Sequence, residues 1–174
     1  DQLALIKRVI KEHRLNEKDF NPRQVLAKIS NAKNDLQTPE ELPLENYRDE
    51  IIQSLYRAYQ AHLVTSNAMD FDDMLLYTAS LMRNQPDVRQ KYAGRFKHIL
   101  VDEFQDTNQA QYDLLFHLGA HHRNLFLVGD EDQSIYRWRG VDYKKVERFR
   151  SDFPDHLEIL LEHNYRSTQT ILDS

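Results

Sequence analysis

Residues 98–106 read His98-Ile99-Leu100-Val101-Asp102-Glu103-Phe104-Gln105-Asp106, a short apolar run that ends in two adjacent carboxylates. Two more short apolar runs follow at 125–128 and 157–161, and helical patterns at about 108–119 and 142–151 separate the three. Strands that alternate with helices form parallel sheets with right-handed crossovers. The sequence therefore predicts an α/β block built on three parallel strands.

The chain before this block shows helical periodicity only. Residues 1–66 hold apolar stripes at helical spacing, and Asn21-Pro22 is a typical helix start. A further helix is predicted after Asp70, with an apolar face that comprises Phe71, Met74, Leu75, Thr78 and Met82. We therefore predict an all-helical block over residues 1–66 and an α/β block with helices flanking its sheet over residues 67–174. Three parallel strands make a small sheet, so we expect its first strands to lie upstream of Asp1.

Composition excludes several classes of protein. The 174 residues contain no Cys, which rules out disulfides and thiol catalysis, and no apolar run approaches the ~20 residues that span a bilayer. Only four glycines occur, none five residues apart, so a phosphate-binding G-x-x-x-x-G-K-S/T loop is absent from the sequence. Without an initiator Met or a signal-peptide pattern, the chain is expected to be a piece of a soluble, cytoplasmic protein.

Ligands of open α/β sheets bind beyond the carboxyl ends of the strands, so the residues after each run are candidates. Asp102 and Glu103 follow the first run. One carboxylate of such a pair can hold hydrated Mg²⁺ while the other takes a proton from an attacking water, as phosphoryl transfer requires. The alternative is a solvated acidic loop that caps the next helix.

After the second run, Gln133 could bridge to a phosphate or a water, and Tyr136 and Trp138 then alternate with Arg137 and Arg139. Aromatic faces between guanidinium groups suit single-stranded nucleic acid, because bases stack on the rings and phosphates pair with the charges. Residues 133–150 carry six basic and two acidic side chains, a local charge of +4 in a chain of net charge −5. The alternative is a turn with a packed Trp and solvated arginines.

After the third run, Arg166 precedes a helix start at Ser167 or Thr168. An Arg at the carboxyl end of a strand could reach a phosphate bound across the sheet, and the alternative is a salt bridge to one of the acids above.

The order of these segments is more specific than any one of them. ILVDEFQDTN at 99–108, LFLVGDEDQSIYRWRG at 125–140 and LEHNYRSTQTIL at 161–172 closely resemble the Walker B, third and fourth motifs of UvrD/Rep/PcrA-type superfamily 1 DNA helicases. DFDDML at 70–75 also resembles a family segment. The resemblance implies a helical subdomain over residues 1–66, inserted in the first RecA-like motor domain, and the later half of that domain over residues 67–174.

The family resemblance also implies roles, cofactors and partners. Asp102 would hold Mg²⁺, Glu103 would activate water, and Gln133 would sense the γ-phosphate of ATP. Tyr165 would lie against the adenine and Arg166 would act as an arginine finger. Tyr136, Trp138 and Arg139 would contact single-stranded DNA or a single-strand/double-strand junction.

The parent protein would be an ATP-driven 3′→5′ helicase of DNA repair or replication, and the chain alone, without a Walker A loop, would be inactive. Two alternatives stay open, a non-catalytic single-stranded-DNA-binding module and the motor of a helicase–nuclease subunit.

Overall fold

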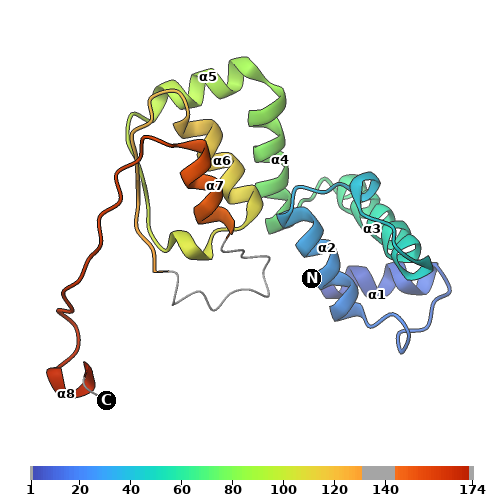
Figure 1. Cartoon of the computed structure of the whole chain (residues 1–174). Coiled ribbons are helices and arrows are strands. Elements are labelled where there is room, and N and C mark those ends of the chain that lie inside the picture. Colours follow the sequence, from blue (N-terminus) through green and yellow to red (C-terminus); the bar gives the residue numbers. More distant parts are fainter. Residues whose placement is uncertain (1, 131–143, 173–174) are drawn as a thin grey trace.

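Helices alone make up the first third of the chain. The structure is a computed structural model that describes residues 2–130 and 144–172. It begins with α1 (Gln2–Glu12), α2 (Pro22–Asn34), the short 3₁₀ helix η1 (Pro39–Glu41) and α3 (Tyr47–Thr65) (Figure 1). The Asn21 side chain accepts hydrogen bonds from the backbone N–H groups of Arg23 and Gln24, which confirms the predicted helix start. The buried stripes of the three helices meet in one apolar core, formed by Ile6, Val9, Ile10, Phe20, Val25, Ile29, Ala32, Leu55, Tyr56, Tyr59 and Leu63.

The rest of the chain builds helices around a small parallel sheet (Figure 1). Helices α4 (Phe71–Asn84), α5 (Pro86–Arg95), α6 (Gln109–Gly119) and α7 (Lys144–Asp152) accompany strands β1 (Ile99–Val101) and β2 (Leu125–Leu127). The strands pair in parallel with Leu100 opposite Phe126, and α6 connects them, as the alternating pattern predicts. A second apolar cluster lies between the sheet and helices α6 and α7, formed by Phe104, Tyr112 and Leu115 with Ile99, Val101, Phe116, Leu125, Leu127, Val146 and Phe149.

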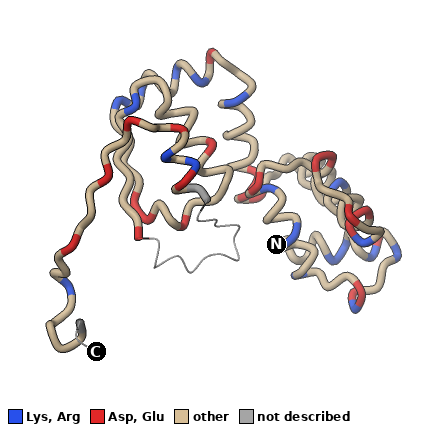
Figure 2. The backbone as a smooth tube through the Cα atoms, viewed as in Figure 1, with Lys and Arg blue, Asp and Glu red and all other residues tan. Residues whose placement is uncertain are grey.

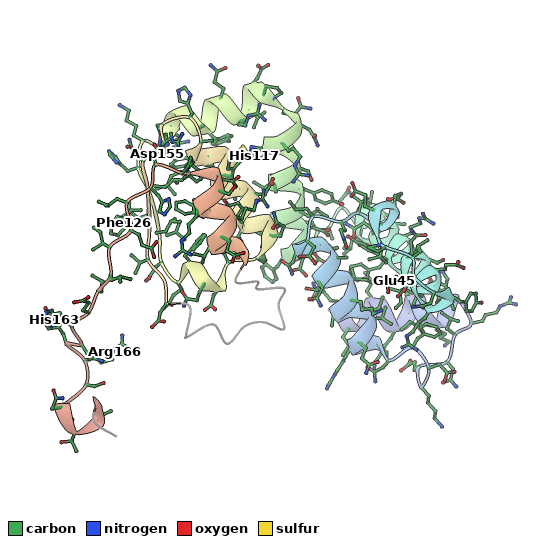
Figure 3. The ribbon with its side chains drawn as sticks, viewed as in Figure 1. Glu45, His117, Phe126, Asp155, His163 and Arg166 are labelled. Carbon is green, nitrogen blue, oxygen red and sulfur yellow. The ribbon has the colours of Figure 1, made fainter. Side chains whose placement is uncertain are left out.

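The sheet is covered on one face only within the described residues. Leu100 and Phe126, which face each other across the two strands, are 75% and 60% exposed. Figure 3 shows Phe126 on the side of the sheet away from the helices. Parallel sheets are normally covered on both faces, so this face is an unusual apolar surface.

The prediction of a third strand at 157–161 is wrong for this structure. The chain runs from α7 without regular structure to the short helix α8 (Gln169–Leu172), along a segment that leaves the body of the molecule (Figure 1). Leu157, Ile159, Leu160 and Leu161 are all exposed. A strand needs a neighbour that satisfies its backbone N–H and C=O groups, and in the described residues β1 and β2 pair only with each other.

The predicted apolar face of α4 is wrong at Phe71 and Met74, whereas Leu75 and Thr78 are half-buried and Met82 is buried. Phe71 is 84% exposed and Met74 is exposed too, whereas the buried residues of the helix are Asp73, Leu76, Ala79 and Met82. The helix is rotated in this way because its first turn faces α2 rather than solvent. Its N-cap is the predicted one, since Asp70 accepts a hydrogen bond from the backbone N–H of Asp73.

A buried ionic cluster joins the first helices to α4. The side chain of Lys33, at the end of α2, is fully buried, and its Nζ lies 2.7 Å from Asp70 Oδ2 and 2.7 Å from Asp73 Oδ1. Tyr59 donates its hydroxyl proton to Asp70 Oδ2 and Gln60 donates to Asp73 Oδ1. Burial alone would raise the pKa of Asp70, but the hydrogen bonds from Lys33 and from the Asp73 backbone lower that pKa below its usual value.

A second set of polar contacts connects α2 and α4 to α6. Ser30 Oγ donates to Asp72 Oδ2 over 2.7 Å, and the Asn34 amide donates to the Ser30 carbonyl oxygen and to Asp72 Oδ1. Asn108, the N-cap of α6, donates its side-chain amide to Asn34 Oδ1. Helices α2, α4 and α6 are therefore tied together by hydrogen bonds as well as by packing.

None of the helices within residues 2–130 and 144–172 is long and apolar enough to cross a membrane.

Candidate functional site

The carboxyl ends of β1 and β2 lie side by side, and the predicted carboxylate pair lies there. Asp102 and Glu103 follow β1 directly, and Gly129 and Asp130 follow β2 shortly after its end. The ends are held together beyond the strands themselves, because Val128 N–H donates to the Val101 carbonyl oxygen over 2.8 Å and Phe104 N–H donates to the Val128 carbonyl oxygen over 2.9 Å. Figure 2 shows acidic residues gathered at this edge of the sheet.

The backbone at Glu103 has an uncommon conformation. Its φ is 50° and its ψ 44°, which is the left-handed region that few residues other than glycine adopt. The turn sends the chain sharply from β1 into the short 3₁₀ helix η2 (Phe104–Asp106). Such conformations cost roughly 1–3 kcal/mol, and four other described residues share a positive φ; at Glu103 the turn lies at the strand ends, beside the carboxylate pair.

Both carboxylates of the pair are exposed, and each has a defined hydrogen bond. Asp102 Oδ1 accepts from the backbone N–H of Glu103 over 2.9 Å, while Glu103 Oε2 accepts from the side-chain amide of Gln105 over 2.7 Å. The two groups thus point to different partners, as separate tasks for the two carboxylates require.

The chemistry of Asp102 fits a magnesium ion. Mg²⁺ binds proteins through one or two carboxylates and completes its octahedron with waters and substrate phosphates. Asp102 offers an exposed carboxylate at a strand end, and only its Oδ1 has a hydrogen bond in the described part of the chain. No group of three or more acidic or histidine side chains that could enclose a metal occurs among the described residues.

Gln105 is a residue of this site that the sequence reasoning missed. It is buried, and besides its bond to Glu103 its Oε1 accepts from the backbone N–H of Asp130 over 3.0 Å. Its position two residues after Glu103, with a tight turn between them, is the signal that could have identified it. The side chain links the two strand ends at the site.

Four predicted site residues, Gln133, Tyr136, Trp138 and Arg139, lie outside the residues that the structure describes, and their predicted roles remain predictions.

The expectation that Arg166 lies near Asp102 at the edge of the sheet is wrong for this structure. Arg166 lies on the extended segment that follows α7, away from the sheet (Figure 3). Tyr165, on the same segment, is 92% exposed. Neither residue is held at the edge of the sheet, because the apolar run 157–161 before them does not pair with either strand. An Asn164 side chain that accepts from the backbone N–H groups of Arg166 and Ser167 fixes only the local turn.

Comparison with known proteins identifies the family. A family model described as "UvrD/REP helicase N-terminal domain" matches residues 1–154. The chain belongs to the UvrD/REP helicase family. The match takes in both the helical part and the carboxylate pair of this UvrD/REP chain, and it confirms the family predicted from the order of the three motifs.

Relatives of the UvrD/REP chain carry a more specific name, ATP-dependent DNA helicase PcrA. The protein of that name from Bacillus subtilis (strain 168) is 46% identical over 174 residues, which is 99% of this chain and 24% of that protein. The one from Staphylococcus aureus (strain Mu50) is 43% identical over 176 residues, and the one from Staphylococcus epidermidis (strain ATCC 35984) is 42% identical over 176 residues. The chain spans about a quarter of the length of these relatives.

Proposed function

We propose that the chain is part of an ATP-dependent DNA helicase and carries part of its ATP-hydrolysing site. The observation that carries this proposal is the Asp102-Glu103 pair at the shared end of two parallel strands. It lies in a UvrD/REP chain whose relatives are named for ATP-dependent action on DNA. ATP and Mg²⁺ are accordingly the proposed cofactors.

The proposed division of the chain is a helical inserted subdomain over residues 1–66 and the later half of the first RecA-like motor domain over residues 67–174. Two separate apolar clusters support it, one drawn from residues 6–63 and one from residues 99–149. The polar joint at Lys33, Asp70 and Asp73 would then connect the subdomain to the motor.

In the proposed mechanism, Asp102 holds the magnesium ion through the carboxylate that β1 presents at its end. When bound, Mg²⁺ neutralises charge that develops on the transferring phosphoryl group. Glu103 accepts the proton of the attacking water, and Gln105 keeps the Glu103 carboxylate oriented for this task. The two acids can divide the work because one is bonded to the backbone and the other to a side chain.

Tyr165, Arg166 and Gln133 complete the proposed nucleotide site, with Tyr165 against the adenine, Arg166 as the arginine finger and Gln133 as the γ-phosphate sensor. For Arg166 this requires the segment after α7 to lie nearer the sheet than it does in this structure.

The proposed DNA contacts are Tyr136, Trp138 and Arg139, with single-stranded DNA and single-strand/double-strand junctions as substrates. We further propose 3′→5′ polarity, a role in repair or replication, and a cytoplasmic location. The interleaved aromatic and basic side chains after β2 support the DNA contacts.

The test is ATP hydrolysis and unwinding by the full-length protein that contains residues 1–174, at one fixed salt concentration because phosphate contacts make DNA affinity salt-dependent. We expect oligo-dT to raise the hydrolysis rate and duplexes with a 3′ single-stranded tail to be unwound. Tight binding of oligo-dT without any ATP hydrolysis would favour a non-catalytic DNA-binding module instead. Preference for a 5′ tail would overturn the polarity alone.

A further inference from the structure

Gln105 makes two hydrogen bonds that meet at the candidate active site. It is the middle residue of η2, and only 8% of the residue is exposed. Its Nε2 donates to Glu103 Oε2 over 2.7 Å, and its Oε1 accepts from the backbone N–H of Asp130 over 3.0 Å. One side chain therefore bridges the carboxylate after β1 and the backbone after β2.

The amide of Gln105 can serve both partners at once. A carboxylate needs a donor and an N–H needs an acceptor, and Gln carries one of each at the end of the same side chain. A Glu at this position would accept from Asp130 but repel Glu103, and a Met would fill the space without either bond. The two partners also fix the orientation of the amide. In the reverse orientation Oε1 would face the Glu103 carboxylate and the Nε2 hydrogens would face the Asp130 N–H.

Gly129 leaves the space that Gln105 occupies. A Cβ added at Gly129 would lie 2.7 Å from Gln105 Oε1, closer than non-bonded carbon and oxygen approach, and 3.3 Å from the Gln105 backbone N. The nearest atom is the end of a flexible side chain, so the amide would move first, while the backbone N of Gln105 would have to give by a few tenths of an ångström. The glycine after β2 and the glutamine after β1 thus fit each other.

We infer that Gln105 is a positioning residue that holds the Glu103 carboxylate against the end of β2, an inference that rests on the proposed function. Glu103 is exposed and its own backbone is left-handed, so without a partner its side chain would sample several rotamers. A proton acceptor must be held near its productive geometry, since a misplacement of about 1 Å can cost about 100-fold in rate. Gln105 supplies this restraint from a buried position, and its second bond ties the acceptor to the neighbouring strand end.

The test compares ATP hydrolysis by the full-length protein and its Gln105→Met variant in the presence of oligo-dT. We expect kcat to fall roughly 10- to 100-fold, the range seen when groups that orient a reactive side chain are removed, with little change in the KM for ATP. Gly129→Ala, which leaves Gln105 in the chain but displaces its amide, should lower kcat in the same direction.

A double-mutant cycle separates positioning from general stability. If Gln105 acts through Glu103, Gln105→Met should lower kcat in the native background but cause no further loss once Glu103→Gln is present. An equal loss in both backgrounds would overturn the inference, as would a native kcat in Gln105→Met.

Gln60→Met is the matched control, because Gln60 Nε2 also donates to a carboxylate, Asp73 Oδ1, over 2.8 Å but lies outside the site. It should leave kcat unchanged even if it lowers the melting temperature as much as Gln105→Met does. The two proposals fail differently. A native protein without DNA-stimulated hydrolysis would contradict the proposed function, whereas an active native protein with an equally active Gln105→Met variant would contradict only the role of Gln105.

Discussion

Glu103→Gln in the full-length protein is expected to lower DNA-stimulated ATP hydrolysis by about 10²- to 10⁴-fold, the usual contribution of a positioned general base. The amide keeps the size of the side chain but cannot take the proton of the attacking water. Binding of ATP should change little, because in the proposed mechanism Glu103 contacts the water and not the nucleotide. Steady-state hydrolysis and nucleotide titration by fluorescence measure the two effects separately.

Glu50→Gln is the control for this substitution. Glu50 is an exposed acid on α3, distant in the chain from the candidate site, and its loss removes the same charge. It should leave hydrolysis unchanged. If Glu103→Gln retained hydrolysis within about threefold of the native protein, Glu103 would not be the base and the assignment of the pair would be withdrawn.

Lys33→Met should destabilise the chain of residues 1–174 by about 3–5 kcal/mol, the usual cost of breaking a buried ion pair by removing one partner. The substitution keeps most of the volume of the side chain but leaves Asp70 and Asp73 buried without their cation. Burial and the nearby negative charge of Asp70 raise the pKa of the Tyr59 phenol well above its usual range. Tyr59 therefore stays a neutral donor and supplies no positive charge to replace that of Lys33. Urea denaturation followed by circular dichroism measures the change.

Lys28→Met is the matched control, because Lys28 Nζ lies 3.1 Å from Asp49 Oδ1 in a bridge whose lysine side chain is 53% exposed. Exposed pairs contribute about 0–1 kcal/mol. Adding Asp70→Asn and Asp73→Asn to Lys33→Met should restore part of the lost stability, since the uncompensated charges are then removed. Equal stability of the Lys33→Met and Lys28→Met variants would show that the buried ionic cluster does not stabilise the contact between α2 and α4.

The features that sequence predicted well are those fixed by neighbours along the chain. Asn21 before Pro22 and Asp70 before Phe71 cap helices with their own side chains, so a few residues contain all the information. The carboxylates at Asp102 and Glu103 were predicted to end a strand for the same local reason. The parallel pairing of β1 with β2 followed from the alternation of strand and helix.

The features that sequence did not predict depend on partners far along the chain. Asp73 is buried because Lys33, forty residues earlier in the chain, pairs with it, and this contact helps to set the buried face of α4. A lysine in α2 carries no local sign of this pairing. Likewise, the apolar run at 157–161 has the composition of a strand, but whether it becomes one depends on a neighbour that satisfies its backbone.

The role of Gln105 could be predicted from sequence only in part. Its bond to Glu103 is local, but its bond to Asp130 exists only because β1 and β2 end at the same edge of the sheet. The sequence therefore placed Asp102 and Glu103 at the end of a strand, as the structure does, but it did not indicate the side chain that joins the two strand ends.

A crystal structure of the full-length protein with Mg²⁺ and a non-hydrolysable ATP analogue is the most direct test of the central claim, that the end of β1 carries the catalytic carboxylates of an ATP-driven motor. The account predicts the metal at the Asp102 carboxylate, at about 2.0–2.1 Å or through one bound water, with Glu103 facing the γ-phosphate. A nucleotide bound elsewhere, with Asp102 and Glu103 both in solvent, would contradict it.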